Sequence, residues 1–363
     1  MYIALYLFVA LLALSALVFF HELGHYTAAK FFGVHVERFS IGFGKIIGRK
    51  QCCNTEWAFS AIPLGGYVKM KGQNDADPTE ISYDDDSYNA KKPWQRIIIL
   101  LAGPIANFIL AFFVYLLIAF MDTPAVVAQG YQAPIIDNIT ADRPAEKIGL
   151  KKGDLILSVN GSSIQYWYEI GEHIQASTGD IRLLIQRGNK TIPFTLYSTL
   201  IDGENEFKEK IKRKIIGIET LVDRNASIQF TPAEALFYAW NETKKASILI
   251  ATGVKKMSTG EVSAKHVGGA ITIFDLIMKF AALGFIYLLF IMAIISVNLG
   301  IMNLLPIPAL DGGHIMFNLY EMFTRRAPSE KAIYALTLAG WAALFGLMGL
   351  GLYNDINRIW GGN

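Results

Sequence analysis

Two histidines and a glutamate near the amino terminus have the types and the spacing of a catalytic metal site. His21 and His25 are four residues apart, and Glu22 directly follows the first of them. Side chains at i and i+4 share one face of a helix, so both imidazoles can bind a single Zn²⁺ ion. The glutamate can then act as general base for a water molecule at that ion. The HExxH pattern therefore predicts metal-assisted hydrolysis.

This pattern directly follows an uninterrupted apolar stretch. Residues 1–20 contain no charged side chain, and at about 1.5 Å rise per residue they can cross about 30 Å of hydrocarbon. They lack the basic start and the small-residue cleavage site of a signal peptide, so we expect them to be retained. We predict a first transmembrane helix within residues 1–33 that carries the HExxH pattern, with hydrolysis inside or at the edge of a membrane.

The composition also indicates a membrane protein. Of 363 residues, 53% are hydrophobic and 18% are charged, and the mean hydropathy is +0.34. A soluble domain carries about 25% charged residues. The net charge is only +2, and a nucleic-acid-binding protein is usually strongly basic, so we exclude nucleic acid as a partner. The two cysteines, Cys52 and Cys53, are adjacent and predict two unremarkable thiols in a reducing compartment.

Three further apolar stretches predict a polytopic α-helical membrane protein with four transmembrane helices. The additional helices are expected in residues 97–121, 280–314 and 332–353. The third span contains Pro306 and Pro308, which remove backbone donors, so its helix should end near Asn303. Irregular backbone at membrane depth is tolerated only where it is buried in protein or lines a polar cavity.

Basic residues predict the orientation in the membrane. Ten Lys and Arg residues lie between the first two spans, and Arg325, Arg326 and Lys331 lie between the last two. Cytosolic loops are enriched in Lys and Arg. We therefore expect both termini on the extracytoplasmic side and the metal motif near the cytosolic face, with the lipid bilayer as a partner of the chain.

The segment between the first two spans has a different pattern. Within residues 34–96, residues 34–71 alternate apolar and polar side chains and are rich in Gly and aromatic residues, and a run of acidic residues follows. This predicts a membrane-associated β-hairpin region followed by a solvated acidic loop, residues 74–89. An open edge of such a sheet either pairs with a substrate strand or the sheet only packs on the membrane face.

Residues 126–222 predict one extracytoplasmic PDZ domain of the α+β type. A short helix should end at Gly149, a turn uses Gly153 and Asp154, and Asn160-Gly161 supports a tight hairpin turn. Such a domain either binds extended peptides by strand addition or acts only as a spacer or size filter.

An amphipathic segment follows. Thr231-Pro232-Ala233-Glu234 forms a capping box with proline at the first helical position. Charges interrupt the apolar residues that follow, so residues 231–279 predict an interfacial amphipathic helix region and not a span.

A catalytic zinc ion usually has three protein ligands and one open coordination position, so a zinc ion bound by the two histidines needs a third protein ligand. Asp311 follows the proline-broken end of the third span, and an ionisable residue at a membrane boundary is costly unless it is paired. We predict Asp311 as this ligand. His314, one turn away, is the rival, although we favour a supporting role for it. Asn303 either contacts the substrate backbone or satisfies the broken helix end.

The motifs together resemble a site-2 protease. They are the HExxH pattern on the first span, Gly103-Pro104-Ile105-Ala106-Asn107 on the second, the segment from Asn303 to His314 on the third, and the intervening PDZ domain. The chain is most similar to the bacterial regulator-of-sigma-E protease branch of these intramembrane zinc metalloproteases. Its best known proteobacterial members have two tandem PDZ domains, whereas residues 126–222 have room for one.

The resemblance implies zinc held by His21, His25 and Asp311, with Glu22 as the catalytic base and Asn303 near the substrate. It implies a bacterial inner membrane protein that cleaves single-span membrane proteins, for example anti-sigma factors or remnant signal peptides. It also implies that an upstream site-1-type protease trims these substrates first.

Two other functions are compatible with parts of the sequence. A membrane protease of the zincin type would have its site in a cytosolic domain, and would need a downstream Glu or His ligand that the cytosolic loops hardly offer. A membrane PDZ receptor or scaffold would hold a purely structural metal, a role that does not require the carboxylate of Glu22.

Overall fold

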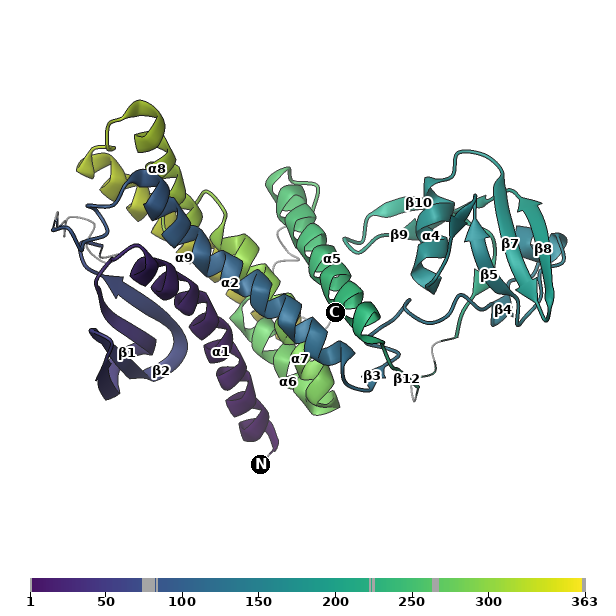
Figure 1. The fold of residues 1–363 in the computed structure, drawn as a ribbon, viewed down its shortest axis with the longest axis horizontal. Coiled ribbons are helices and arrows are strands. Elements are labelled where there is room, and N and C mark those ends of the chain that lie inside the picture. The colour runs from purple at the N-terminus through teal and green to yellow at the C-terminus, as the bar shows by residue number, and fades with distance from the viewer. Residues whose placement is uncertain are drawn as a thin grey trace. The chain divides into compact units, whose positions relative to one another are not determined.

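Two units make up the chain. The computed structural model describes residues 2–73, 82, 84–221, 223, 226–262 and 268–360. One unit combines Met1–Ile118 with Pro232–Asn363, and the other is Ala119–Thr231. The first contains the long helices and a β-hairpin, and the second is built mainly from short strands (Figure 1).

Four helices of the first unit are long and apolar enough to cross a membrane, counted within the described residues. They are α1 (Tyr2–Phe31), α2 (Pro93–Ala119), α7 (Phe285–Asn303) and α9 (Glu330–Trp360). Their number and order agree with the four predicted spans. α1 continues beyond the apolar stretch to Phe31, so the HExxH residues are part of the same helix. α7 ends at Asn303, as the two prolines predicted.

The predicted start of the third span is wrong by five residues. We predicted a span from residue 280, but α7 begins at Phe285. Gly284 has a φ of +136°, which interrupts the helix and separates α7 from α6 (Ala270–Leu283). The sequence pattern did not reveal this break because the apolar residues continue across the glycine.

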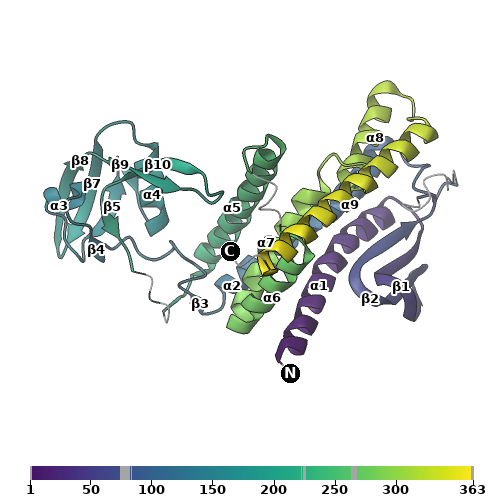
Figure 2. The same cartoon turned by 180° about the vertical axis from the view of Figure 1, so that it is seen from behind.

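The predicted interfacial region, residues 231–279, contains two helices. α5 (Pro232–Ser258) starts at the proline of the capping box, and α6 follows. α5 contacts α7, whereas α6 contacts α1, α7 and α9. Ile277 of α6 lies in one apolar cluster with Leu17 of α1 and Ile291 of α7. Figure 2 shows the side of this unit on which α6 lies beside α7 and beside α9.

A long β-hairpin covers α1. β1 (Val36–Cys52) and β2 (Thr55–Met70) are antiparallel and joined by Cys53 and Asn54, both with φ of +55°, the backbone of a type I′ turn. The two cysteine thiols are free and exposed at this tip. Phe39 of β1 is fully buried and stacks on Trp57 of β2, with ring centroids 4.5 Å apart.

Irregular pairing makes the hairpin curl on itself. Ser40 of β1 pairs with Ala58 and also with Tyr67, so the first half of β1 lies between the two halves of β2. Residues 66–70 of β2 therefore form an outer edge, and no further strand within the described chain pairs with them. The sequence predicted several short strands; the structure has two long strands with repeated register shifts instead.

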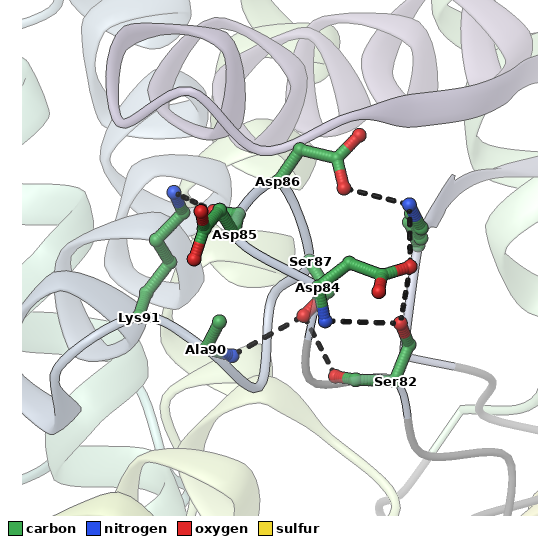
Figure 3. A network of polar contacts seen from close by, with 8 residues as sticks. Ser82, Asp84, Asp85, Asp86, Ser87, Ala90 and Lys91 are labelled. Carbon is green, nitrogen blue, oxygen red and sulfur yellow. Dashed lines mark hydrogen bonds and ion pairs between the residues drawn. The ribbon is translucent and has the colours of Figure 1, made fainter.

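The predicted acidic loop is partly folded. Residues 74–81 and 83 lie outside the described chain, but residues 84–91 form two consecutive turns (Figure 3). The ammonium of Lys71, just after β2, lies 2.8 Å from a carboxylate oxygen of Asp84 and 2.7 Å from one of Asp86. Hydrogen bonds to Lys71 hold the pKa of both carboxyls below the usual range. The acidic side chains are exposed, as predicted for a solvated loop, but these ion pairs attach the segment to the end of β2.

The second unit has a four-stranded antiparallel sheet in the order β6-β5-β7-β8. The strands are β5 (Leu155–Val159), β6 (Ser162–Ser163), β7 (Ile181–Arg187) and β8 (Lys190–Leu196). The short helix α3 (Pro144–Lys147) precedes β5, and α4 (Trp167–Ala176) lies between β6 and β7. Ile156, Ile174 and Ile185 belong to its apolar core.

Short paired strands and a second hairpin complete this unit. They are β3 (Thr123–Pro124), β4 (Asn138–Ile139), β9 (Thr199–Glu204), β10 (Lys210–Ile215), β11 (Ile218–Glu219) and β12 (Ser227–Ile228). The predicted turns are present: α3 ends just before Gly149, and Asn160 and Gly161 both have positive φ between β5 and β6.

A buried carboxylate holds the predicted turn of this unit in place. Asp154 accepts two hydrogen bonds of 2.7 Å from the Arg187 guanidinium and one of 2.8 Å from the backbone N–H of Lys151. Burial alone would raise the pKa of Asp154, but these hydrogen bonds lower it below its usual value. The carboxylate therefore stabilises the fold when it is ionised.

We expect Asp154→Asn to lower the free energy of unfolding of this unit by about 1–3 kcal/mol at neutral pH, because charge-assisted hydrogen bonds are lost. The pKa of Asp154 in the folded unit lies below its value in the unfolded chain, which is about 3.9. The ionised carboxylate therefore stabilises the fold fully above about pH 3.9, and this stabilisation is lost as the pH falls through the pKa of the folded state. Hydrogen exchange of β5 and β7 amides in the full chain at pH 7 and in acid would measure this. A difference between wild type and variant that persists undiminished in acid would contradict it.

Candidate metal centre

Helix α1 places both histidines of the motif on the face that packs against α2. Their rings are 4.8 Å apart, and both side chains are nearly buried. This packing depends on a glycine in each helix. A Cβ atom added at Gly24 of α1 would lie 2.2 Å from the carbonyl oxygen of Ala102, and one added at Gly103 of α2 would lie 2.2 Å from Nε2 of His25. The two glycines thus let the helices approach closely enough to bury the imidazoles between them.

The broken end of α7 returns the chain to the same place. After Asn303, residues 304–310 form irregular turns around the two prolines, and Asp311 is the first residue of α8 (Asp311–Thr324). The positive end of a helix dipole favours a carboxylate at this position. Arg96 of α2 binds Glu321 further along α8 at 2.6 Å and attaches this helix to α2.

Three candidate ligand atoms lie at the corners of a small triangle. Nε2 of His21 lies 3.2 Å from Nε2 of His25, and Oδ2 of Asp311 lies 3.3 and 3.4 Å from these two nitrogens. Bonds of 2.0–2.1 Å at tetrahedral angles place zinc ligands about 3.3–3.4 Å apart. The observed triangle therefore has the dimensions of one face of a tetrahedral zinc site, and the fourth corner is left for water or substrate.

The hydrogen bonding of these three atoms leaves them able to bind a cation. Oδ2 of Asp311 is buried and accepts no hydrogen bond, and an unpaired buried carboxylate oxygen is costly. A divalent ion held by His21, His25 and Asp311 would satisfy that oxygen and use the lone pairs of both nitrogens at once. Two imidazoles and one carboxylate are ligands that zinc accepts, so the residues present fit the metal that the sequence predicted.

The other nitrogen of His25 is already occupied. Its Nδ1 lies 2.9 Å from the carbonyl oxygen of Ile99 on α2. A carbonyl oxygen only accepts, so Nδ1 carries the hydrogen and Nε2 of the neutral ring is free to bind a metal. Helix α2 thus fixes the tautomer of His25 through its backbone.

Glu22 and Asn303 lie beside the three ligand atoms. Both line a cavity of about 150 Å³ that also contains the three ligand side chains. The amide nitrogen of Asn303 is 3.3 Å from Nε2 of His21, the nitrogen that faces the carboxylate. The structure thus brings together all five residues that the sequence singled out. The remaining lining residues come from β2 and the turn after it, from α2, from the segment between α7 and α8, and from α8: Gly66, Tyr67, Val68, Met70, Gln73, Leu100, Ala309, Leu310 and His314.

His314, the rival third ligand, lines the cavity without joining the triangle. Among the described residues, the group whose ligand atoms lie within 4.8 Å of one another comprises His21, His25 and Asp311. The His314 ring instead packs edge-on against Phe317, with centroids 6.0 Å apart. Its position agrees with the supporting role that we favoured.

Two contributors to the site were missed by reasoning from chemical groups. One is Gly103, which was named above only as part of the motif on the second span; it has no functional group, and its role is to make space for the imidazoles. The other is the edge of β2, residues 66–70, which lines the cavity. Ser60, in the middle of β2, is by contrast buried and pairs with Ile46. Only the curling of the hairpin brings the later residues of β2 to the metal ligands.

Comparison with known proteins gives a consistent result over almost the whole chain. The profile of peptidase family M50 matches residues 9–347. A protein of Campylobacter jejuni named "Putative zinc metalloprotease" is 44% identical over 350 residues, which cover 96% of this chain and 93% of the relative. Proteins with the same description from Helicobacter pylori (strain J99) and Clostridium acetobutylicum are 36% and 35% identical, and the matches cover 97% and 94% of this chain and 99% and 94% of the relatives.

Solved structures also match a part of the chain. Among them is the PDZ domain of an SdrC-like protein from Listeria monocytogenes, which is 21% identical. The match covers 24% of this chain and 86% of that domain, with a TM-score of 0.20.

Proposed function

Since the chain belongs to peptidase family M50, the site-2 proteases, we propose that it is an intramembrane zinc endopeptidase that cleaves single-span membrane proteins. The observation that carries this proposal is the triangle of His21, His25 and Asp311, whose three sides of 3.2–3.4 Å suit one metal ion. α1, which carries both histidines, and α7, whose end leads to Asp311, are apolar enough to cross a membrane, which favours a site at membrane depth.

We propose the same setting for the protein that the sequence predicted. The chain would lie in a bacterial inner membrane, with both termini extracytoplasmic and the site near the cytosolic face. Its substrates would be single-span proteins already trimmed by a site-1-type protease, such as anti-sigma factors or remnant signal peptides. The positive-inside distribution of Lys and Arg supports this orientation. The PDZ domain in residues 126–222 would bind or exclude the trimmed ends.

The residues of the site have distinct tasks in hydrolysis. When bound, the zinc ion supplies Lewis-acid chemistry: it acidifies a water molecule and polarises the carbonyl of the scissile bond. Glu22 accepts the proton of the attacking water and returns it to the leaving amine. Asn303 hydrogen-bonds the substrate backbone, whose peptide groups need partners in a dry site. His21, His25 and Asp311 hold the metal, and the surrounding helices exclude bulk water.

The edge of β2 offers a way to hold the substrate in an extended form. Residues 66–70 have β1 on one side only and line the cavity of the metal ligands. A peptide that adds to this edge would present its backbone to Glu22 and Asn303. A helical span cannot be cleaved until its backbone is exposed, so unwinding against this strand would serve the reaction.

The test measures zinc content and proteolysis together. Purified wild-type protein in detergent should bind one zinc ion per chain and cleave a tagged single-span substrate. Asp311→Ala removes one corner of the triangle, so both zinc and cleavage should be lost. Asp275→Ala, which removes an exposed carboxylate of α6 that pairs only locally with Lys279, is the matched control and should change neither.

The contradicting outcomes are distinct. Asp311→Ala protein that keeps zinc and activity would place the site elsewhere. Wild-type protein that binds zinc without cleaving any substrate would favour the receptor or scaffold function with a structural metal.

A further inference from the structure

The side chain of Asn107 on α2 contacts His21, the first of the two ligand histidines. The side chain is completely buried, and its amide nitrogen Nδ2 lies 3.0 Å from Nδ1 of His21. Its carbonyl oxygen Oδ1 is also buried and has no hydrogen-bond partner. A buried asparagine with an unused acceptor next to a metal-ligand imidazole needs an explanation.

Metal binding sets the hydrogen position on His21. A neutral imidazole carries one N–H, and the nitrogen that binds a metal must be free of it. Nε2 of His21 faces Asp311 and His25, so the hydrogen belongs on Nδ1, which then needs an acceptor. The amide nitrogen of Asn107 is a donor and cannot fill this role, whereas its oxygen can.

A turn of the amide by 180° supplies that acceptor. Oδ1 would then occupy the position 3.0 Å from Nδ1 and accept its hydrogen, and Nδ2 would take the position that Oδ1 now has. Either orientation leaves one amide atom unpartnered, so the state of His21 decides between them. The orientation that accepts from Nδ1 is the one compatible with a metal at Nε2.

We propose that Asn107 is a positioning residue that holds His21 in the tautomer and ring orientation required to bind zinc. This rests on the proposed zinc site. Helix α2 then serves both histidines, through the carbonyl of Ile99 at His25 and through the side chain of Asn107 at His21. The backbone of Asn107 is itself held by Ser296 of α7, whose hydroxyl donates to its carbonyl at 2.8 Å.

The proposal predicts a specific pattern of zinc affinities. Asn107→Leu has a similar shape but no acceptor, and should weaken zinc binding by about 10–100-fold, the usual effect of removing such a partner. Asn107→Asp keeps an acceptor towards Nδ1 and should bind zinc at least as tightly as wild type. Ser296→Ala removes the neighbouring contact between α7 and α2 but leaves the Asn107 side chain, and should change zinc affinity less than threefold. Competition with a chromogenic chelator measures all four dissociation constants in the intact protein.

A second measurement separates positioning from folding. Thermal unfolding of the zinc-free forms should give similar midpoints for wild type, Asn107→Asp and Asn107→Leu. If Asn107→Leu does not fold, Asn107→Ala replaces it in the comparison. Wild-type affinity in the variants without an acceptor, or an Asn107→Asp affinity as weak as theirs, would overturn the proposal. A wild-type protein without zinc, or zinc retained by Asp311→Ala, would instead overturn the proposed metal site.

Discussion

Replacing Glu22 by glutamine is expected to reduce the cleavage rate of a single-span substrate by a factor on the order of 10²–10⁴, the usual contribution of a general acid–base group. Glutamine keeps the size of the side chain but cannot accept a proton from water. Glu22 lines the cavity without belonging to the group of close ligand atoms, so zinc should remain bound at one ion per chain. Loss of activity with intact zinc is the signature of a catalytic base and not of a ligand.

Single-turnover cleavage and zinc content, measured on the same preparation, check this expectation. The control is Glu330→Gln, which makes the same chemical change at an exposed residue at the start of α9. Its rate should equal that of wild type. If Glu22→Gln protein cleaved at the wild-type rate, a different group would have to take the proton, and the mechanism proposed above would be wrong.

Gly103→Ala is expected to abolish zinc binding through a single methyl group. The new Cβ would lie 2.2 Å from Nε2 and 2.5 Å from Cε1 of His25, and 2.9 Å from Cε1 of His21. Such contacts force both imidazoles away from the triangle, since rigid rings cannot bend around the methyl group. In an exposed helix the same substitution stabilises by about 1 kcal/mol, so helix propensity cannot account for a loss. We expect zinc affinity to fall by more than about 100-fold, with no detectable cleavage, because two ligands are displaced together.

The matched control for this prediction is Gly346→Ala in α9. It makes the same change in another apolar helix, at a position where the added Cβ meets no atom within 4 Å. Its zinc affinity and its activity should stay at the wild-type level. If Gly103→Ala bound zinc as tightly as Gly346→Ala, the two histidines would not lie against α2 as described.

The chemistry of this site was more predictable than its surroundings. His21 and His25 could be paired from their helical spacing, and Asp311 could be added because a carboxylate beside a proline-broken span needs a partner. Both inferences use local sequence and a rule about burial. The end of α7 at Asn303 followed in the same way from two prolines.

The parts that were missed depend on packing between distant segments. Gly103 was named only as part of a motif on the second span, and the approach of α1 to α2 is what reveals why a glycine is needed there. The curl of the β-hairpin was not predictable because its register shifts repeatedly, and a strand pattern of period two does not specify where a bulge occurs. The break at Gly284 lay inside a continuous apolar run, where glycine alone is a weak signal.

The separation of the ligands along the chain has a consequence for how the protein is made. His21 and His25 lie on α1, and Asp311 follows His21 by 290 positions along the chain. At about 5–20 residues per second of synthesis, a growing chain carries both histidines for roughly 15–60 s before the aspartate exists. During that time the chain has only two of the three proposed zinc ligands, and the helices that surround the site are not all present. We therefore expect that a nascent chain cannot cleave the proteins of the translocation machinery. Proteolysis can begin only after Asp311, the first residue of α8, has been translated.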